Sequence, residues 1–81
     1  MGDIKLSKLA QSLKLGQYEH YKGNKYQVLG VAIHSEILEE LVIYKALYGK
    51  HLTWVRPLAI FLENVEYNGK KQPRFKYIGS M

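Results

Sequence analysis

The sequence predicts a mainly β domain, and two turn signals after residue 15 are the basis of that prediction. Gly23-Asn24 and Asn68-Gly69 each lie between segments rich in tyrosine and β-branched or other large apolar residues. Such residues fit a pleated, half-buried surface, and both dipeptides suit the two-residue loop of an antiparallel hairpin. We therefore expect two β-hairpins.

The turn chemistry also predicts how the strands of each hairpin pair. A two-residue loop at Gly23-Asn24 sets Tyr21 opposite Tyr26 and His20 opposite Gln27. In the second hairpin, residues 65–67 lead into the Asn-Gly turn and residues 74–78 return. Its return strand begins with Lys70, Lys71 and Pro73. Lysine and proline are typical of an exposed sheet edge, so we expect that segment to be exposed.

The first fifteen residues have a different, helical pattern. Leu6, Leu9, Ala10 and Leu13 fall on one face of a helix over residues 3–14. We expect Asp3 to cap its start and Gly16 to end it in a left-handed conformation. Helices this short depend on tertiary packing, so a partly ordered tail is the alternative. The predicted organisation is therefore a helix or tail over 1–15, the domain over 16–78 and a tail over 79–81.

Residues 35–48 fit two patterns equally well. Ile37, Leu41, Tyr44 and Tyr48 recur at helical spacing with Gly49 as a stop, whereas alternation puts Val42, Tyr44, Ala46 and Tyr48 on one face of a strand. Further on, Pro57 suits the first position of a helical turn that runs through Phe61, and Asn64 can close it.

Length and composition restrict the class of protein. A chain of 81 residues forms one domain with a thin core. With no cysteine it has neither a disulfide framework nor a thiolate metal site, which fits a cytoplasmic protein. No apolar run reaches the roughly 20 residues that span a bilayer, and the N-terminus has no signal-peptide pattern, so we expect no membrane association.

The motifs of the chain resemble those of a family of small bacterial proteins that is known as a domain of unknown function. The matching segments are Gly16-x-Tyr18-x-His20-Tyr21-Lys22-Gly23, Tyr26-x-Val28, His34-Ser35-Glu36, Glu39, Val42-x-Tyr44, Leu47-Tyr48-Gly49, Trp54-Val55-Arg56-Pro57, Phe61, Val65 and Pro73-Arg74-Phe75. The resemblance runs from about Leu15 to Ile78. It implies a bacterial cytosolic protein with an SH3-type barrel, and a strand at 41–48. Together with the hairpins, it predicts a mainly β, SH3-like small barrel of about five antiparallel strands, with a short helical turn and an N-terminal helix.

Metal binding and catalysis are both disfavoured by the residues present. The three histidines, His20, His34 and His51, have no recognised metal spacing, so we predict no metal site and no cofactor. Histidine with Glu36, Glu39 or Glu40 offers acid–base chemistry, and a small enzyme of that kind is an alternative. The chain has neither a cysteine nucleophile nor a glycine-rich phosphate loop, so we do not expect an enzyme.

The arginines and aromatic residues are the best candidates for function. Ten of the twelve basic residues are lysines, and the only arginines, Arg56 and Arg74, each adjoin one of the two prolines. A guanidinium is preferred where a planar donor must meet an anion or an aromatic face in fixed geometry. Both arginines can instead be internal clamps that fork onto Glu36 or Glu39. The candidate ligand-binding residues are His20, His34, Glu36, Tyr44, Trp54, Arg56 and Arg74.

These observations predict a non-catalytic binding module for a peptide or an anionic small ligand. Seven tyrosines and one tryptophan suit a half-exposed groove, although they also suit the half-buried surface of a small barrel. A nucleic-acid accessory domain, with a net charge of +5 and stacking tyrosines, is the alternative. Against it, the lysines are dispersed along the chain, whereas a nucleic-acid footprint is clustered. The oligomeric state has no signal in the sequence.

Overall fold

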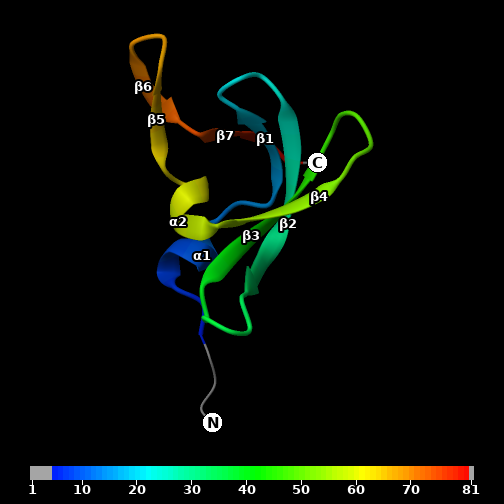
Figure 1. Ribbon diagram of the computed structural model, residues 1–81, viewed down its shortest axis with the longest axis vertical. Helices are drawn as coiled ribbons and strands as arrows, with labels where there is room; N and C mark the ends of the chain where they lie inside the picture. The colour runs from blue at the N-terminus through cyan, green and yellow to red at the C-terminus, as the bar shows by residue number, and fades with distance from the viewer. Residues whose placement is uncertain (1–4, 81) are drawn as a thin grey trace.

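The prediction of a mainly β chain is confirmed by the computed structural model, which describes residues 5–80. The strands are β1 Gly16–His20, β2 Lys25–Ile33, β3 Glu40–Ala46, β4 Thr53–Pro57, β5 Asn64–Tyr67, β6 Lys70–Pro73 and β7 Phe75–Gly79, and the helices are α1 Lys8–Ser12 and α2 Leu58–Phe61. Five strands form one sheet in the order β4-β3-β2-β1-β7, and β5 and β6 form a separate two-stranded ribbon (Figure 1).

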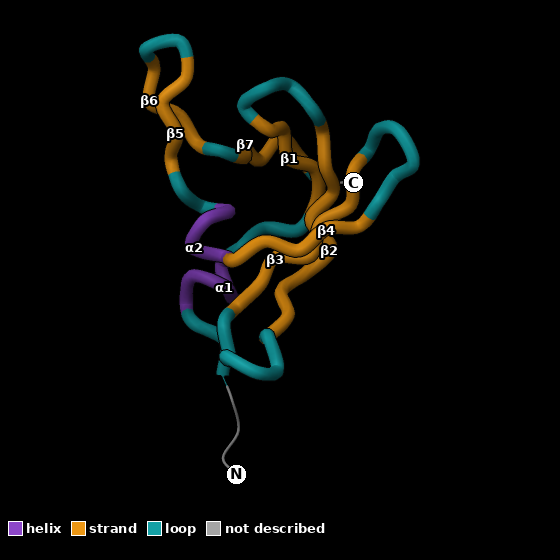
Figure 2. Tube along the Cα trace, viewed as in Figure 1, coloured by secondary structure: helices purple, strands orange, loops and turns teal. Residues whose placement is uncertain are grey.

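The five-stranded sheet is antiparallel and irregular at two places. Its register shifts between Gln17 and Tyr18 on β1, and between Val28 and Gly30 on β2. Such bulges increase the local twist and bend a strand. Figure 2 shows the bent sheet, with β1 and β7 crossing over the end of the β2–β3–β4 layer. In the described part of the chain β4 and β7 remain the two edges of the sheet, so the closed SH3-type barrel stays a prediction.

Of residues 35–48, which fitted both a helix and a strand, residues 40–46 form a strand; the strand expected over 41–48 ends at Ala46, before Leu47 and Tyr48. β3 pairs with β2 on one side and β4 on the other, and its burial alternates so that Val42, Tyr44 and Ala46 face the core. Alternation therefore decided the structure over helical spacing, because two partner strands satisfy the backbone of β3. Gly49 lies in the β3–β4 loop with a φ of 58°.

The first hairpin exists, but its predicted register is wrong. Tyr26 lies opposite Tyr18 rather than Tyr21, and Gln27 lies opposite Gln17 rather than His20. The loop is longer than two residues because the His20 carbonyl accepts from the amide of Gly23. His20 Nδ1 also accepts from the amide of Lys22 at 3.2 Å. These local bonds compete with the strand ladder and end β1 at His20.

The second hairpin has the predicted turn and a different return strand. Asn68 and Gly69 have φ values of 52° and 76°, and Tyr67 lies opposite Lys70, as in a type I′ turn. The return strand is β6, which is exposed as expected at Lys70, Lys71 and Pro73. The predicted return over 74–78 is wrong, because Phe75 to Gly79 forms β7 and pairs with β1.

The N-terminal helix is shorter than predicted. α1 covers only Lys8–Ser12, and its N-cap is Ser7, whose hydroxyl accepts from the amide of Ala10. The predicted cap, Asp3, lies outside the described residues. Gly16 does not end the helix but opens β1 with a φ of 132°. Ala10 is buried and its apolar neighbours Leu6 and Leu13 pack beside it, which explains why so short a helix is held on the domain.

The core lies between the sheet, α1 and α2 and is largely aromatic. Its buried residues are Ala10, Tyr18, Val28, Val42, Tyr44, Leu58, Phe61 and Phe75. Phe61 of α2 stacks on Phe75 of β7, with ring centroids 4.2 Å apart. The helical turn expected after Pro57 is present, with Pro57 as its N-cap, but Leu62 rather than Asn64 ends it. This packing fixes the positions of β4 and β7, and therefore of both arginines.

Candidate functional site

The candidate site begins with the pairing of β3 and β4. Tyr44 lies opposite Trp54, and Val42 lies opposite Arg56. Directly opposite residues in an antiparallel pair project to the same face, so Trp54 and Arg56 share the core-facing side of the sheet. Because β4 is an edge strand, its side chains lie at the rim of that face rather than in its centre. Trp54 is 49% exposed, and Arg56 is half-buried.

Arg56 is held by two aromatic residues. Its Nε donates to the hydroxyl of Tyr44 at 3.2 Å, and its guanidinium lies 5.5 Å from the centre of the Phe75 ring. Both partners are buried core residues. An arginine that is stacked and hydrogen-bonded in this way loses little further freedom when it binds an anion.

An open hollow of about 240 Å³ lies in front of this arginine. We call it the arginine–tyrosine hollow, and it is lined by Tyr26, Tyr44, Tyr48, Trp54 and Arg56. Across it the hydroxyls of Tyr26 and Tyr48 are hydrogen-bonded to each other. Burial, with the hydrogen bond to Tyr48 next in importance, raises the pKa of Tyr26 to about 12. The phenol of Tyr26 is therefore neutral at pH 7, and the tyrosines of the hollow offer hydroxyl groups and apolar ring faces.

Arg74 lies between β6 and β7 and ties three segments together. Its amide donates to the Glu63 carbonyl at 3.0 Å, and its carbonyl accepts from the amide of Tyr21 at 3.0 Å. Its Nη2 is 3.2 Å from Glu63 Oε1, the only salt bridge among residues 5–80. Its Nε is buried and has no hydrogen-bond partner within the described chain.

His20 lies close to both arginines. Burial, followed by the positive charges of Arg56, Arg74 and Lys22, lowers the pKa of His20 below its ordinary value of 6.5. Its ring centre is 5.0 Å from that of Phe75 and 6.5 Å from that of Tyr26. Because Nδ1 accepts from Lys22, neutral His20 carries its proton on Nε2 and can donate there.

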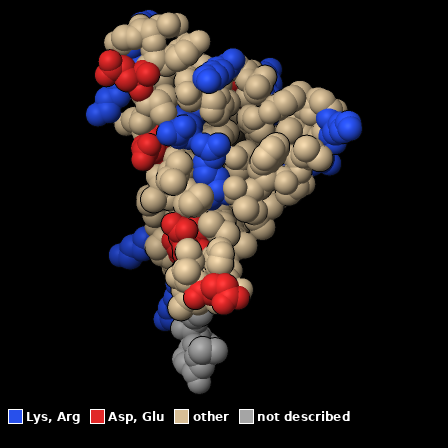
Figure 3. Space-filling view, in the orientation of Figure 1, with Lys and Arg blue, Asp and Glu red and all other residues tan. Residues whose placement is uncertain are grey.

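A second hollow of about 450 Å³ lies on the other side of His20. We call it the histidine hollow, and its lining is Glu19, His20, Tyr21, Gly23, Gln72, Pro73 and Lys76. His20 lines this hollow and Tyr26 lines the arginine–tyrosine hollow, and the centres of the two rings are 6.5 Å apart. Figure 3 shows lysine and arginine side chains gathered over the centre of this face, between the β5–β6 ribbon and the hairpin loops.

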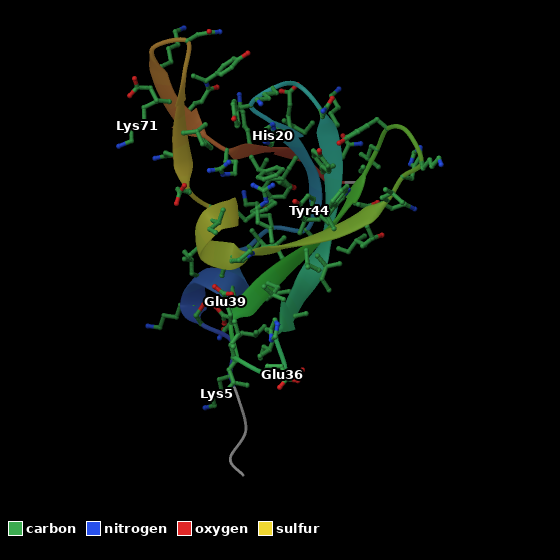
Figure 4. All side chains as sticks on the ribbon, viewed as in Figure 1. Lys5, His20, Glu36, Glu39, Tyr44 and Lys71 are labelled. Atoms are coloured by element: carbon green, nitrogen blue, oxygen red, sulfur yellow. The ribbon has the colours of Figure 1, made fainter. Side chains whose placement is uncertain are left out.

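The structure brings five of the seven sequence candidates to this region and separates the other two from it. His20, Tyr44, Trp54, Arg56 and Arg74 belong to the region. Figure 4 shows Glu36 near the N-terminal end of the molecule, far from His20 and Tyr44. His34 Nδ1 accepts from the amides of Glu36 and Ile37 at 3.1 and 3.4 Å, so this ring shapes the β2–β3 turn.

The alternative interpretation of the arginines as clamps on Glu36 or Glu39 is wrong. Arg74 pairs with Glu63, and Arg56 hydrogen-bonds to Tyr44. Arg56 lies on β4 and Arg74 lies between β6 and β7, whereas Glu36 and Glu39 lie in the β2–β3 turn, which Figure 4 shows away from His20. Among residues 5–80, no cluster of three or more histidine, aspartate or glutamate side chains is placed to hold a metal ion.

Sequence reasoning missed three residues of the region. Tyr26 and Tyr48 line the arginine–tyrosine hollow, and Phe75 lies beneath the Arg56 guanidinium. The excess of tyrosine over phenylalanine was the available signal, because a phenol suits a half-buried position where its hydroxyl finds a partner. Which of the seven tyrosines meet depends on strand register, which the sequence predicted incorrectly for the first hairpin.

Comparison with known proteins places this chain in a family. The family model described as "Protein of unknown function (DUF1653)" matches residues 16–77. This chain belongs to the DUF1653 family. A crystal structure of a DUF1653 protein from Bordetella bronchiseptica is 38% identical, with a TM-score of 0.82, and the match covers 89% of this chain and 95% of that chain. No curated protein matches the chain. The expected membership in a family of unknown function is thus confirmed, while the SH3-type barrel and the individual signature motifs stay predictions.

The helices of this DUF1653 protein have no membrane-spanning character. Neither α1 nor α2, the helices in residues 5–80, has the length and apolar composition needed to cross a bilayer.

Proposed function

We propose that this DUF1653 domain is a non-catalytic binding module that holds an anionic ligand in the arginine–tyrosine hollow. The observation that supports this most is the environment of Arg56. The guanidinium is half-buried against Phe75 and Tyr44, yet no carboxylate pairs with it within the described chain. A half-buried cation is normally paired, because its removal from water costs free energy. A ligand anion would supply the missing charge.

The neighbours of Arg56 support an anion rather than a neutral ligand. Arg74 and Arg56 both lower the pKa of His20, which places two permanent positive charges near one imidazole. The buried Nε of Arg74 has no partner among residues 5–80. Whichever of the Tyr26 and Tyr48 hydroxyls accepts in the bond between them, and His20 Nε2, add neutral donors around the same region. Sulfate, phosphate or carboxylate groups accept from such donors.

The arrangement of the remaining side chains favours binding over catalysis. His20 is the only histidine of the region, and its Nδ1 is used by the Lys22 amide rather than by an orienting carboxylate. Of the glutamates offered by the sequence as acid–base partners, Glu36 and Glu39 lie away from His20 (Figure 4), and Glu40 accepts from the amide and the hydroxyl of Ser7. Within the described residues no carboxylate is hydrogen-bonded to His20 to orient it for acid–base work, so the site is better suited to binding.

A nucleic-acid ligand is the second candidate, and the exposed aromatic residues favour it. Trp54 and Tyr48, both exposed, adjoin Arg56 and offer ring faces on which a base can stack. Ionic strength separates the two ligand classes. Binding of an oligonucleotide through several phosphates should weaken steeply as salt is raised, whereas binding of a single small anion should weaken modestly.

Sulfate titration tests the proposal. Trp54 is the only tryptophan of the chain, so its fluorescence reports directly on the hollow. We expect saturable quenching or enhancement by sulfate at constant ionic strength. Arg56→Gln should weaken sulfate binding about tenfold or more, since charged hydrogen bonds contribute about 1.5–3 kcal/mol. Lys71→Gln, which removes the same charge from the exposed β6 strand, should change it less than about twofold. Equal effects of both substitutions would show a non-specific charge effect and refute the site.

A further inference from the structure

We propose that the open edge of β4 adds an extended acidic peptide as a sixth strand of the sheet, with a peptide carboxylate on Arg56. This inference rests on the proposed function, because it names the partner whose anion enters the arginine–tyrosine hollow. In the described chain β4 is bonded to β3 alone, so its other edge is free (Figure 1). A free edge offers a row of backbone donors and acceptors to an incoming strand.

The register shows which backbone groups face that free edge. The amide of Ala46 donates to the carbonyl of Leu52, which makes these opposite residues a hydrogen-bonded pair. Hydrogen-bonded and non-hydrogen-bonded pairs alternate along an antiparallel ladder. Trp54 and Arg56 therefore turn their amides and carbonyls toward β3, whereas Thr53 and Val55 turn theirs outward. Pro57, which has no N–H, takes the next outward position, where a proline costs no ladder bond.

The side chains of β4 distinguish it from a guarded edge. The β6 strand of the ribbon carries Lys70, Lys71 and Pro73, which oppose pairing with another chain. On β4, Thr53 and Val55 turn their backbone amides and carbonyls toward the free edge. Their side chains are uncharged and exposed, that of Val55 at 58%. Both are β-branched and favour extended pairing. At Thr53 and Val55 the β4 edge thus lacks the lysines that protect the ribbon, and Pro57 blocks only the end of the edge.

Charge identifies the partner as acidic. Residues 41–62, which form β3 after its first residue Glu40, the loop, β4 and α2, contain Lys45, Lys50 and Arg56 and no aspartate or glutamate. An added strand would place alternate side chains beside Trp54 and Arg56, on the face of the arginine–tyrosine hollow, and the others beside Thr53 and Val55. Acidic residues suit the positions beside Trp54 and Arg56, and valines suit the positions beside Thr53 and Val55. A second copy of this chain is disfavoured as occupant, because its β4 would bring Arg56 of each copy to one interface.

A designed peptide tests the pairing. The probe is the capped heptapeptide acetyl-Thr-Val-Glu-Val-Glu-Val-Thr-amide, and a version with glutamine in place of both glutamates tests the charge. In the expected register the valine amides face β4 and the glutamate amides face solvent. N-methylation of the three valine amides should weaken binding about tenfold or more, because at least two hydrogen bonds of about 1 kcal/mol are lost. N-methylation of the two glutamate amides should change binding less than about threefold, since those amides make no bond to the protein.

The measurements are Trp54 fluorescence and amide hydrogen exchange. The peptide should slow exchange at Thr53 and Val55, while the glutamine peptide should bind at least about tenfold more weakly than the glutamate peptide. Val55→Pro removes one outward amide and leaves the β3 ladder intact, and it should weaken the peptide but not sulfate. If this variant does not fold, the two methylated peptides still decide the question with the unaltered protein.

Each other result overturns the inference. Equal binding of both methylated peptides would show that the anion site works without strand addition. Binding of sulfate or an oligonucleotide but not of the acidic peptide would leave the proposed function in place and refute the peptide. A concentration-dependent dimer that Val55→Pro abolishes would make a second copy the occupant. Failure of sulfate and every peptide together would refute the proposed function itself.

Discussion

The hydroxyl of Tyr44 accepts a hydrogen bond of 3.2 Å from Nε of Arg56, so a buried residue of β3 orients the arginine at the rim of β4. Tyr44 is only 4% exposed, which means that the phenol is fixed by the core. A guanidinium oriented from its Nε side leaves its two terminal nitrogens for other partners. This relationship explains why an arginine rather than a lysine stands next to Pro57.

The first prediction is an energetic coupling between these two residues. Arg56→Lys and Tyr44→Phe should each lower the free energy of unfolding by about 1 kcal/mol, since each removes one partner of the bond. In urea denaturation the double variant should lose less than the sum of the single variants, with a coupling of about 0.5–1.5 kcal/mol. Strictly additive losses would show that the hydrogen bond contributes nothing to stability.

The second prediction is that Arg74→Lys is the milder arginine substitution. The salt bridge joins a side chain with 21% exposure to Glu63 with 57% exposure, and such exposed pairs contribute less than about 1 kcal/mol. Lysine also removes the buried Nε that lacks a partner, while the backbone bonds of residue 74 to Glu63 and Tyr21 remain. The melting temperature should therefore fall less for Arg74→Lys than for Arg56→Lys. The reverse order would contradict this prediction.

Several parts of the fold were predicted from local sequence patterns, because turns and short helices depend on only a few neighbouring residues. Asn68-Gly69 forms the predicted turn since both positions need positive φ, and Pro57 begins the predicted helical turn. The register at Gly23-Asn24 was wrong because the side chain of His20 bonds to the loop backbone. Strand propensities do not account for a side chain that competes with the strand ladder for the backbone amides of the loop.

The sequence predicted the residue types of the candidate site but not how those residues are arranged in space. Arg56 and Trp54 were identified because their types are rare in this chain. Their neighbours Tyr26 and Phe75 come from β2 and β7, which approach β4 only through the order of the whole sheet. Contacts between residues so distant in the sequence depend on pairing choices, and local patterns do not specify them.

The third prediction concerns Gly16, where β1 approaches the end of β7. A Cβ at this position would lie 2.6 Å from the Gly79 carbonyl oxygen, and the φ of 132° strains any L-residue. Gly16→Ala should therefore destabilise the domain by about 2 kcal/mol or more, as judged by urea denaturation. Gly30→Ala is the matched control, since nothing lies within 4 Å of its Cβ. That variant should be neutral or slightly stabilising, and similar losses at both positions would contradict the steric argument.

The fourth prediction concerns the turn of the ribbon. Gly69 has a φ of 76° with open space around its Cβ, so conformation alone limits the residue. Gly69→Val should cost about 1 kcal/mol or more, because a β-branched residue resists positive φ. Gly69→Asn, which tolerates that region, should cost distinctly less in the same thermal melts. Equal stability of the two variants would show that the ribbon does not contribute to the cooperative unfolding of the domain.

The last prediction is a pH dependence at His20. Burial and the nearby charges of Arg56, Arg74 and Lys22 lower the pKa of this imidazole in the folded chain below 6.5. On acidification the unfolded chain binds the proton first, so unfolding takes up a proton between 6.5 and the lowered pKa. The contribution of His20 to the free energy of unfolding should therefore be greatest above pH 6.5. It should fall as the pH drops from 6.5 to the lowered pKa. His20→Gln should flatten this slope.

Sulfate should raise the pKa of His20, because an anion on Arg56 offsets one of the positive charges that lower it. NMR titration of the His20 ring should give a midpoint below 6.5 without sulfate and a higher midpoint when sulfate is bound. In Arg56→Gln the midpoint without sulfate should already be higher, since one of the nearby positive charges is gone, and added sulfate should then move it much less. A midpoint at or above 6.5 in the unaltered, sulfate-free protein would mean that the cations do not act on His20, and the proposed anion site would lose its electrostatic basis.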